Sequence, residues 1–137
     1  MSIICAQETG LAAEEYIHCV SQSALGPTRP LGNPERVQAY LDNSPLVITA
    51  RTAQGDLAGV FRGVTDWHWV CYCADLAVAE PYQDQGIGKQ LMAKAVEILG
   101  PGIGITLFSL PGAKGFYQSI GLEQTDDAFF HNRTIST

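Results

Sequence analysis

The sequence of 137 residues contains no apolar run of the roughly 18 residues that a transmembrane helix requires. Its first residues include no basic segment, and Glu8 follows too early for the apolar core of a signal peptide. We therefore expect a cytoplasmic protein with no membrane partner. None of the four cysteines belongs to a CxxC pair and no HExxH motif is present, so we expect buried thiols and no metal.

Basic residues are scarce, since eight Lys and Arg stand against fourteen Asp and Glu, a net charge of −6. An acidic surface repels phosphate backbones, so we expect no nucleic-acid partner, and it favours cationic small molecules. The composition is otherwise that of a folded protein, with 46% hydrophobic and 16% charged residues. The length fits one domain over residues 1–137.

Hydrophobic periodicity predicts an alternation of strands and helices. Strands are expected over 3–6, 46–50, 57–64, 67–78 and 103–110, with one or two more over 128–136. Helices are expected over 11–25, 34–42, 86–99 and 113–120. The order β-α-α-β-β-β-α-β-α-β predicts an α/β fold built on one mixed sheet.

The stretch from Asp75 to Met92 carries the clearest chemical signal. A buried strand runs into a short polar loop, and Gly86 and Gly88 open an amphipathic helix. Glycines let the backbone approach a ligand, and the unpaired N–H groups of a first helical turn suit a pyrophosphate. The sequence has no GxxxxGK[ST] motif, and the glycines at 100, 102 and 104 follow a helix, so they predict its end.

Two motifs in this half of the chain carry a family resemblance. Gln83-x-x-Gly86-x-Gly88, after the strand residues Leu76-Ala77-Val78, resembles the acetyl-CoA signature of the GNAT superfamily of N-acetyltransferases. Phe116-Tyr117-Gln118-Ser119-Ile120-Gly121-Leu122 is similar to the second block of that family. The resemblance implies a GNAT-like fold with acetyl-CoA as co-substrate, and a primary amine, on a small molecule, as the acceptor.

The resemblance also implies roles for individual residues. Backbone groups of one strand would bind the pantetheine, and backbone amides of the following loop would hold the pyrophosphate. The cofactor-binding residues expected on this basis are Leu76, Ala77, Val78, Gln83, Asp84, Gln85, Gly86, Ile87, Gly88, Lys89 and Tyr117. An N–H near Val78 would polarise the thioester carbonyl. Tyr117 would act as general acid toward the departing thiolate, unless it is a core tyrosine that packs under the sheet.

The catalytic base is left open by the sequence. Leu110 stands where many family members have an asparagine, and Ile105 where some have a glutamate. Asp75 is the nearest carboxylate, but strand alternation points it away from Tyr72 and Ala74 unless a bulge re-aims it. Asp75 is therefore either the base or a structural residue. If it is structural, the proton leaves through water, or the enzyme accepts amines that are already neutral.

The function and the surroundings of the site are open in four further respects. A non-catalytic CoA-binding domain of the same fold would also explain the missing asparagine and glutamate. In a third interpretation, the acceptor is a protein N-terminus or a lysine side chain. Arg29 and Arg62 are expected either to contact substrate or phosphate or to be solvated on the surface. The apolar tail at 128–130 either pairs with a second copy, as in a homodimer, or finishes the sheet.

Overall fold

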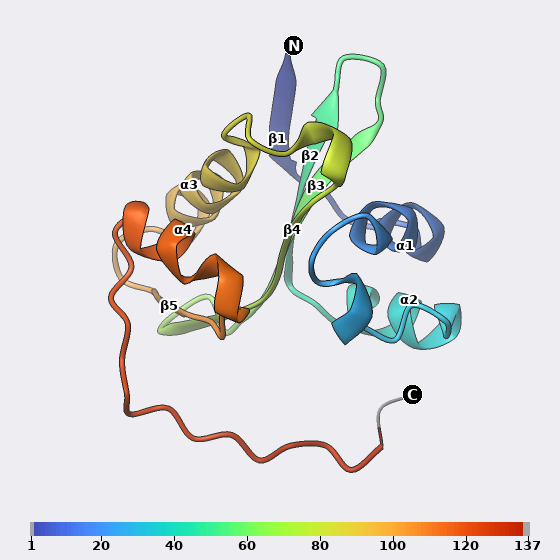
Figure 1. The fold of residues 1–137 in the computed structure, drawn as a ribbon. Helices are drawn as coiled ribbons and strands as arrows, with labels where there is room; N and C mark the ends of the chain where they lie inside the picture. Colours follow the sequence, from blue (N-terminus) through green and yellow to red (C-terminus); the bar gives the residue numbers. More distant parts are fainter. Residues whose placement is uncertain (1, 136–137) are drawn as a thin grey trace. The chain divides into compact units, whose positions relative to one another are not determined.

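Five strands form one mixed sheet in the order β1-β2-β3-β4-β5 (Figure 1). They are β1 (Ile3–Gln7), β2 (Leu46–Thr52), β3 (Leu57–Thr65), β4 (Val70–Val78) and β5 (Gly104–Thr106). The first four pair antiparallel in sequence order, and β5 pairs parallel with β4. The structure is a computed structural model that describes residues 2–135. It confirms the predicted α/β class and its mixed sheet.

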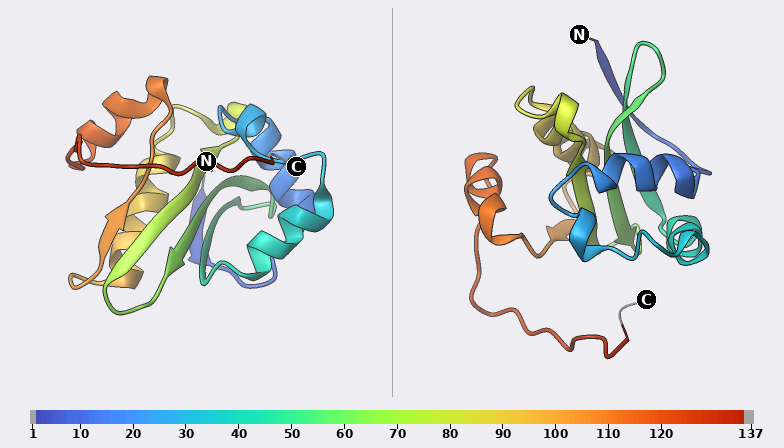
Figure 2. Two further views of the ribbon diagram at one scale, coloured as in Figure 1. Left: turned by 90° about the horizontal axis from the view of Figure 1, so that it is seen from below. Right: turned by 45° about the vertical axis from the view of Figure 1, so that its right-hand side comes forward.

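Helices cover both faces of this sheet. The helices α1 (Ala13–Ser21) and α2 (Pro34–Asp42) lie on one face, and α3 (Ile87–Leu99) lies on the other (Figure 2). Short 3-10 turns follow α1 and β4, namely η1 (Gly26–Thr28) and η2 (Glu80–Tyr82). Within residues 2–135, no helix is long and apolar enough to cross a membrane.

Local signals in the sequence explain where two of the helices begin and end. Asn33 caps α2, because its side-chain oxygen accepts a hydrogen bond from the backbone N–H of Arg36 at 3.2 Å. Pro34 occupies the first helical position, where its missing N–H costs nothing. Gly100 ends α3 with φ of 81°, a backbone conformation that favours glycine. The predicted helix start at 34 and helix end at 100 are thus confirmed.

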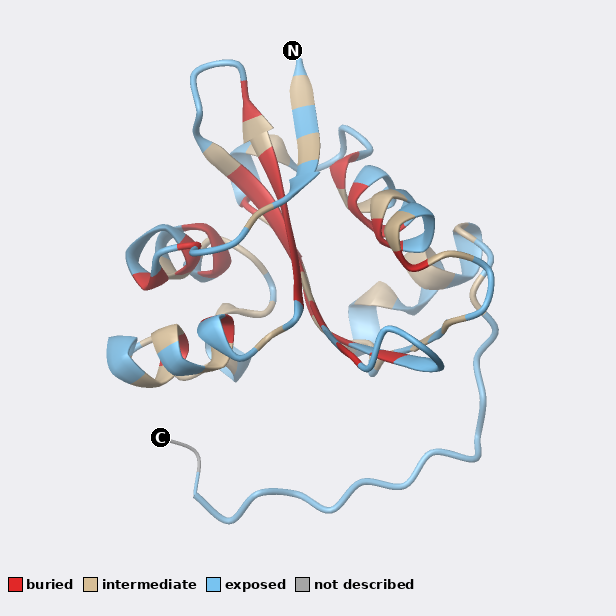
Figure 3. Ribbon diagram, turned by 180° about the vertical axis from the view of Figure 1, so that it is seen from behind, coloured by how far each residue is buried: buried red, intermediate tan, exposed pale blue. Residues whose placement is uncertain are grey.

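The core extends along both faces of the sheet (Figure 3). On the α1 and α2 face, Tyr16 and Val20 of α1 pack with Val37 of α2 and Val60 of β3, all fully buried. On the other face α3 approaches β3 closely at Gly59. A Cβ there would lie 2.9 Å from the Ala77 carbonyl oxygen and 3.1 Å from Leu91 Cδ1, so only glycine fits without a shift.

The chain divides into two compact units, residues 1–107 and 108–137. The first contains the whole sheet with α1, α2 and α3. The described part of the second contains η3 (Pro111–Ala113), α4 (Lys114–Ser119) and the tail to residue 135. Within it, the rings of Phe108 and Phe130 meet edge to face, with centroids 5.5 Å apart.

Two strand predictions near the C-terminus need correction. No strand follows α4 through residue 135, and Phe129 is 94% exposed there. Residue 136, the last of that expected segment, lies outside the described residues. An apolar segment becomes a strand only where a partner edge accepts its hydrogen bonds. The strand expected over 103–110 shrinks to β5, because its pairing with β4 stops at Tyr72, next to a register shift in β4.

The start of the third expected strand also needs correction. Residues 67–69 turn instead of pairing, and β4 begins only at Val70. The turn forms because Asp66 Oδ1 accepts hydrogen bonds from the N–H groups of His68, Trp69 and Val70. A short acidic side chain can satisfy such local donors and so compete with the strand ladder.

Candidate functional site

The loop between β4 and α3 is built from unusual backbone conformations. Asp84 has φ of 62° and Gly86 has φ of 78°, both in the left-handed region. The side-chain amide of Gln83 donates a hydrogen bond to the Val78 carbonyl at 2.9 Å, which ties the loop back to the end of β4. Gly86 then caps α3, because its carbonyl accepts the first helical hydrogen bond, from Gln90 N–H at 3.0 Å.

This geometry leaves a row of backbone donors without partners. In the described part of the chain no hydrogen bond uses the N–H groups from Gly86 to Lys89. A Cβ added at Gly86 would meet no atom within 4 Å, so the space beside the loop is open. Successive unpaired N–H groups at the positive end of a helix form a cradle for an anion. Residues that the sequence singled out for pyrophosphate therefore present neighbouring unpaired N–H groups at the start of α3.

The edge of β4 beside this loop is open along most of its length. β5 pairs with β4 only at Val70, Cys71 and Tyr72. From Cys73 to Val78, β4 has a partner strand on its β3 side alone, within residues 2–135. Leu76, Ala77 and Val78 therefore lie on an edge that can accept an extended ligand as an added strand.

A β-bulge lies where β4 separates from β5. Arg62 of β3 pairs with Asp75, and the residue after it, Gly63, pairs with Cys73. Ala74 is thus an extra residue in β4. Without the bulge, Cys73 and Asp75 would share a face. With it, Asp75 turns to the face that α1 and α2 cover, so the bulge that the sequence left open is present.

On that face Asp75 is the centre of a buried polar network rather than an open base. Its side chain is fully buried, and Arg29 and Arg62 bind its two oxygens through their Nε atoms at 2.7 and 2.6 Å. Tyr16 donates its hydroxyl proton to Oδ2 of Asp75 at 2.5 Å and accepts one from Tyr40 at 2.9 Å. The Arg62 guanidinium also lies 4.2 Å from the centroid of the Tyr40 ring.

The electrostatics of the network follow from these contacts. Burial opposes the charge of Asp75, but Arg62 and Arg29 together hold the pKa of its carboxyl below its usual range. Burial and the Asp75 charge raise the pKa of Tyr16, so it stays a donor. A buried carboxylate with two guanidinium partners is a weak base, and this arrangement favours the structural role for Asp75.

The network also corrects the expectation for the two arginines. Neither Arg29 nor Arg62 is a freely solvated surface residue, with side chains 22% and 11% exposed. Sequence reasoning missed that both arginines and Tyr16 bind one carboxylate, and that Tyr40 joins them through Tyr16. The only signal in the sequence was that a bulge in β4 would decide which face Asp75 occupies.

Tyr117 belongs to the second unit and is described there by itself. It lies on α4, where its ring meets that of Phe116 edge to face with centroids 5.1 Å apart. Its carbonyl accepts a hydrogen bond from Leu122 N–H at 3.1 Å, across Gly121 with φ of 95°. The second sequence block is thus a short helix with a glycine at its end. Leu110, in the place of the family's asparagine, directly precedes η3.

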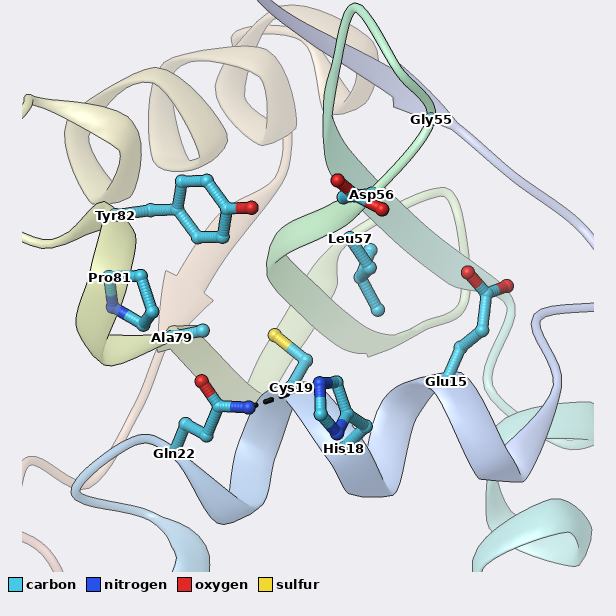
Figure 4. A pocket seen from close by; sticks show the side chains of 10 residues that line it. All are labelled: Glu15, His18, Cys19, Gln22, Gly55, Asp56, Leu57, Ala79, Pro81 and Tyr82. Carbon is cyan, nitrogen blue, oxygen red and sulfur yellow. Dashed lines mark hydrogen bonds between the residues drawn. The ribbon is translucent and has the colours of Figure 1, made fainter.

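A pocket of about 480 Å³ lies between α1, the β2–β3 turn and η2 (Figure 4). Figure 4 shows Tyr82 directed across it toward Asp56. Its lining residues are Glu15, His18, Cys19, Gln22, Gly55, Asp56, Leu57, Ala79, Pro81 and Tyr82. None of the residues expected to bind the cofactor is among them, so this pocket is separate from the cradle.

Comparisons with known proteins bear on the family of this chain. The sequence matches the acetyltransferase (GNAT) family over residues 14–122. The fold resembles that of a GNAT family acetyltransferase from Streptococcus pneumoniae TIGR4, with a TM-score of 0.73, 24% identity, and coverage of 96% of this chain and 99% of that one.

Two further solved structures were determined with ligands. An aminoglycoside acetyltransferase from an uncultured soil metagenomic sample, in complex with sisomicin, gives a TM-score of 0.71 at 18% identity, covering 96% of each chain. A GNAT family N-acetyltransferase from Escherichia coli, in complex with CoA, gives 0.69 at 19% identity, covering 88% of this chain and 68% of that one. At these identities the structures show the fold alone. Because the family match spans most of the sequence, the chain belongs to the acetyltransferase (GNAT) family.

Proposed function

We propose that this protein is an acetyl-CoA-dependent N-acetyltransferase that acetylates a primary amine on a small molecule, with residues 1–137 acting as one GNAT-like domain. The observation that carries the proposal is the row of unpaired N–H groups from Gly86 to Lys89, next to the open edge of β4. Family membership supports acyl transfer. The relatives crystallised with CoA and with sisomicin support the choice of CoA and of an amine.

The residues present fit acetyl-CoA. The N–H groups at the start of α3 supply donors for the pyrophosphate oxygens, and the open space at Gly86 leaves room for them. Lys89, on the exposed side of the first turn, adds a positive charge in an otherwise acidic protein. Backbone groups of Leu76, Ala77 and Val78 would bind the pantetheine as an added strand.

The transfer needs little chemistry from the protein. When bound, acetyl-CoA supplies an acetyl thioester whose carbonyl carbon a neutral amine attacks. An N–H near Val78 would stabilise negative charge on the carbonyl oxygen. Tyr117 would give its hydroxyl proton to the leaving thiolate as the C–S bond breaks, and would regain a proton from solvent. The surplus proton of the new amide nitrogen would leave to water, because Asp75 is engaged by Arg29 and Arg62.

Calorimetry and turnover test the proposal together. We expect acetyl-CoA to bind selectively in isothermal titration, beside a titration with ATP. A panel of aminoglycosides, polyamines and amino-acid esters should then yield at least one acceptor that releases free CoA thiol. Absence of acetyl-CoA binding by folded protein would show that the loop from Gln83 to Gly88 has been misinterpreted.

A second candidate is a non-catalytic CoA-binding domain. Leu110 and Ile105 favour it, because both stand where family members place polar residues that serve the cofactor or the acceptor. Selective binding of acetyl-CoA with no thiol release across the panel would support this second function. Labelled acetyl-CoA mixed with protein extract would test a protein acceptor, since labelled protein bands would indicate that class.

A further inference from the structure

Arg29 holds the bulge of β4 from outside the sheet. It follows η1, on the connection between α1 and α2, far in sequence from β4. Its Nη2 donates a hydrogen bond to the Ala74 carbonyl at 2.6 Å, and its Nε binds Oδ1 of Asp75 at 2.7 Å. One planar guanidinium therefore binds two successive residues, the extra residue of the bulge and the one after it.

We call the two bonds from Arg29 to Ala74 and Asp75 the Arg29 clamp. Further contacts hold the clamp in place. Nη1 of Arg29 donates to the Thr28 hydroxyl oxygen at 2.8 Å, which orients the guanidinium from its own loop. Arg62 and Tyr16 bind the second oxygen of Asp75, so the carboxylate is fixed from β3 and from α1 as well. A bulge leaves its extra residue unpaired in the ladder, and Arg29 supplies the partner that the Ala74 carbonyl lacks.

The clamp lies where the two strands part. β5 follows β4 only as far as Tyr72, and the bulge comes at Cys73 to Asp75. Leu76, Ala77 and Val78, the edge that would bind the pantetheine, directly follow the bulge, so the clamped backbone sets the direction of that edge. The angle at which the N–H near Val78 meets the thioester carbonyl then depends on the bonds that Arg29 makes on the face covered by α1 and α2.

We propose that Arg29 is a positioning residue for acetyl transfer, which clamps the β4 bulge from the α1–α2 connection and so sets the strand edge that holds the thioester. This inference rests on the proposed function, because it assigns the open edge of β4 to acetyl-CoA. Arg29 does not touch the reacting groups, since its contacts run to Thr28, Ala74 and Asp75.

The test compares Arg29→Lys with Arg51→Lys. Arg51 is a matched control, because its guanidinium also bridges two groups, Glu8 and Glu15, at 2.8 Å each, and its side chain is 24% exposed. It lies on β2, away from β4. A lysine at 29 keeps the charge but replaces the planar fork of the guanidinium with one ammonium on a flexible chain, so it does not hold the Ala74 carbonyl and the Asp75 carboxylate in the same fixed geometry.

We expect Arg29→Lys to lower kcat for the best acceptor by about tenfold or more, since a displaced reacting group is costly. Its dissociation constant for CoA should stay within about threefold of the parent protein, because the cradle at α3 is untouched. Arg51→Lys should leave both constants near those of the parent. Equal loss of kcat and CoA affinity in Arg29→Lys, or an unchanged kcat, would overturn the inference.

Hydrogen exchange tests the clamp by a measurement that does not depend on acetyl transfer. Amides of residues 73–76 should exchange about tenfold faster in Arg29→Lys than in the parent protein, and no faster in Arg51→Lys. Unchanged exchange there would reject the clamp even if the protein transfers acetyl groups. A parent protein that binds no acetyl-CoA would instead reject the proposed function. Should Arg29→Lys fail to fold, Thr28→Val loosens the same guanidinium more gently and is expected to shift kcat and exchange in the same directions.

Discussion

At the scale of single residues, Asp75 shows how one buried charge can organise several elements. A carboxylate without water is costly unless cations and hydrogen bonds surround it. Here two guanidinium groups and one phenol do so, and no buried side-chain N or O atom lacks a partner within residues 2–135. Removing one member lowers the free energy of unfolding by more than the intact cluster contributes to it, because the remaining charges stay buried.

Replacing Asp75 with asparagine should therefore destabilise the protein strongly. Both Arg29 and Arg62 would lose their ionic partner while staying largely buried, so the free energy of unfolding should fall by about 3–5 kcal/mol. Urea denaturation measures this loss in the free energy of unfolding. Glu97→Gln is the control, since the side chain of Glu97 is 71% exposed in its contact with Lys94. This substitution should change the free energy of unfolding by less than about 0.5 kcal/mol. A loss for Asp75→Asn as small as for Glu97→Gln would contradict this account of the network.

The proposed role of Tyr117 as general acid also depends on a single residue. Tyr117→Phe removes only the hydroxyl, so kcat should fall by about 10²-fold while the dissociation constant for CoA changes little. Steady-state thiol release and calorimetry give the two values. Tyr82→Phe, a matched hydroxyl deletion on η2, should leave kcat unaltered. Full activity of Tyr117→Phe would leave Tyr117 as a packing residue only.

At the scale of elements, the strand–loop–helix unit from β4 to α3 combines an open strand edge with a row of unpaired N–H groups, the two features to which we assign acetyl-CoA. Both depend on backbone rather than on side chains. Gly86 takes a left-handed conformation, and its carbonyl starts α3. Because the proposed donors are N–H groups, we expect binding to tolerate side-chain changes at exposed positions but not a change of backbone conformation.

Gly86→Ala tests that element. A Cβ at φ of 78° strains the backbone by about 1–2 kcal/mol, and a relaxed loop would misdirect its N–H groups. We expect CoA affinity to drop by about tenfold, measured by calorimetry. Gly100→Ala is a close control, with φ of 81° and equally open surroundings at the other end of α3. Gly100→Ala should lose at least as much stability as Gly86→Ala but keep its CoA affinity. Equal losses of CoA affinity in the two variants would contradict the proposed role of the loop.

At the scale of the whole molecule, the acidic groups set the dependence of stability on pH. The net charge is −6, yet several carboxylates are bound by arginines. Hydrogen bonds from Arg51 lower the pKa of Glu8 and that of Glu15, and Arg62 and Arg29 lower that of Asp75 against the effect of burial. A carboxyl whose folded pKa lies below its unfolded value favours the folded state above that unfolded value.

The stability should therefore be full at neutral pH and fall once the pH drops below about 4, the ordinary range of these groups. Urea midpoints at pH 7, 5, 4 and 3 would measure this. The decline should be shallower in Asp75→Asn, because that variant has already lost one of the linked groups. Midpoints that do not change between pH 5 and 3 would contradict the assignment.

Local signals determined much of this protein before any tertiary contact is considered. The helix start at Asn33 and Pro34, the turn at Gly55 and the end of α3 at Gly100 each depend on a few neighbouring residues. The same holds for the loop before α3, because the left-handed Gly86 and the hydrogen bond from Gln83 to Val78 lie close together along the chain. Such features follow from conformational preferences that act locally.

Only the tertiary structure decided the role of Asp75 and the extent of the strands. The face that Asp75 occupies depends on the register between β3 and β4, which a bulge shifts by one residue. Its partners arrive from α1, from the connection after η1 and from β3. The extent of β5 is likewise set by its pairing, which stops at Thr106 opposite Tyr72, just before the bulge in β4. Hydrogen-bond partners distant in sequence set these features, and hydrophobic periodicity carries no information about which partner is present.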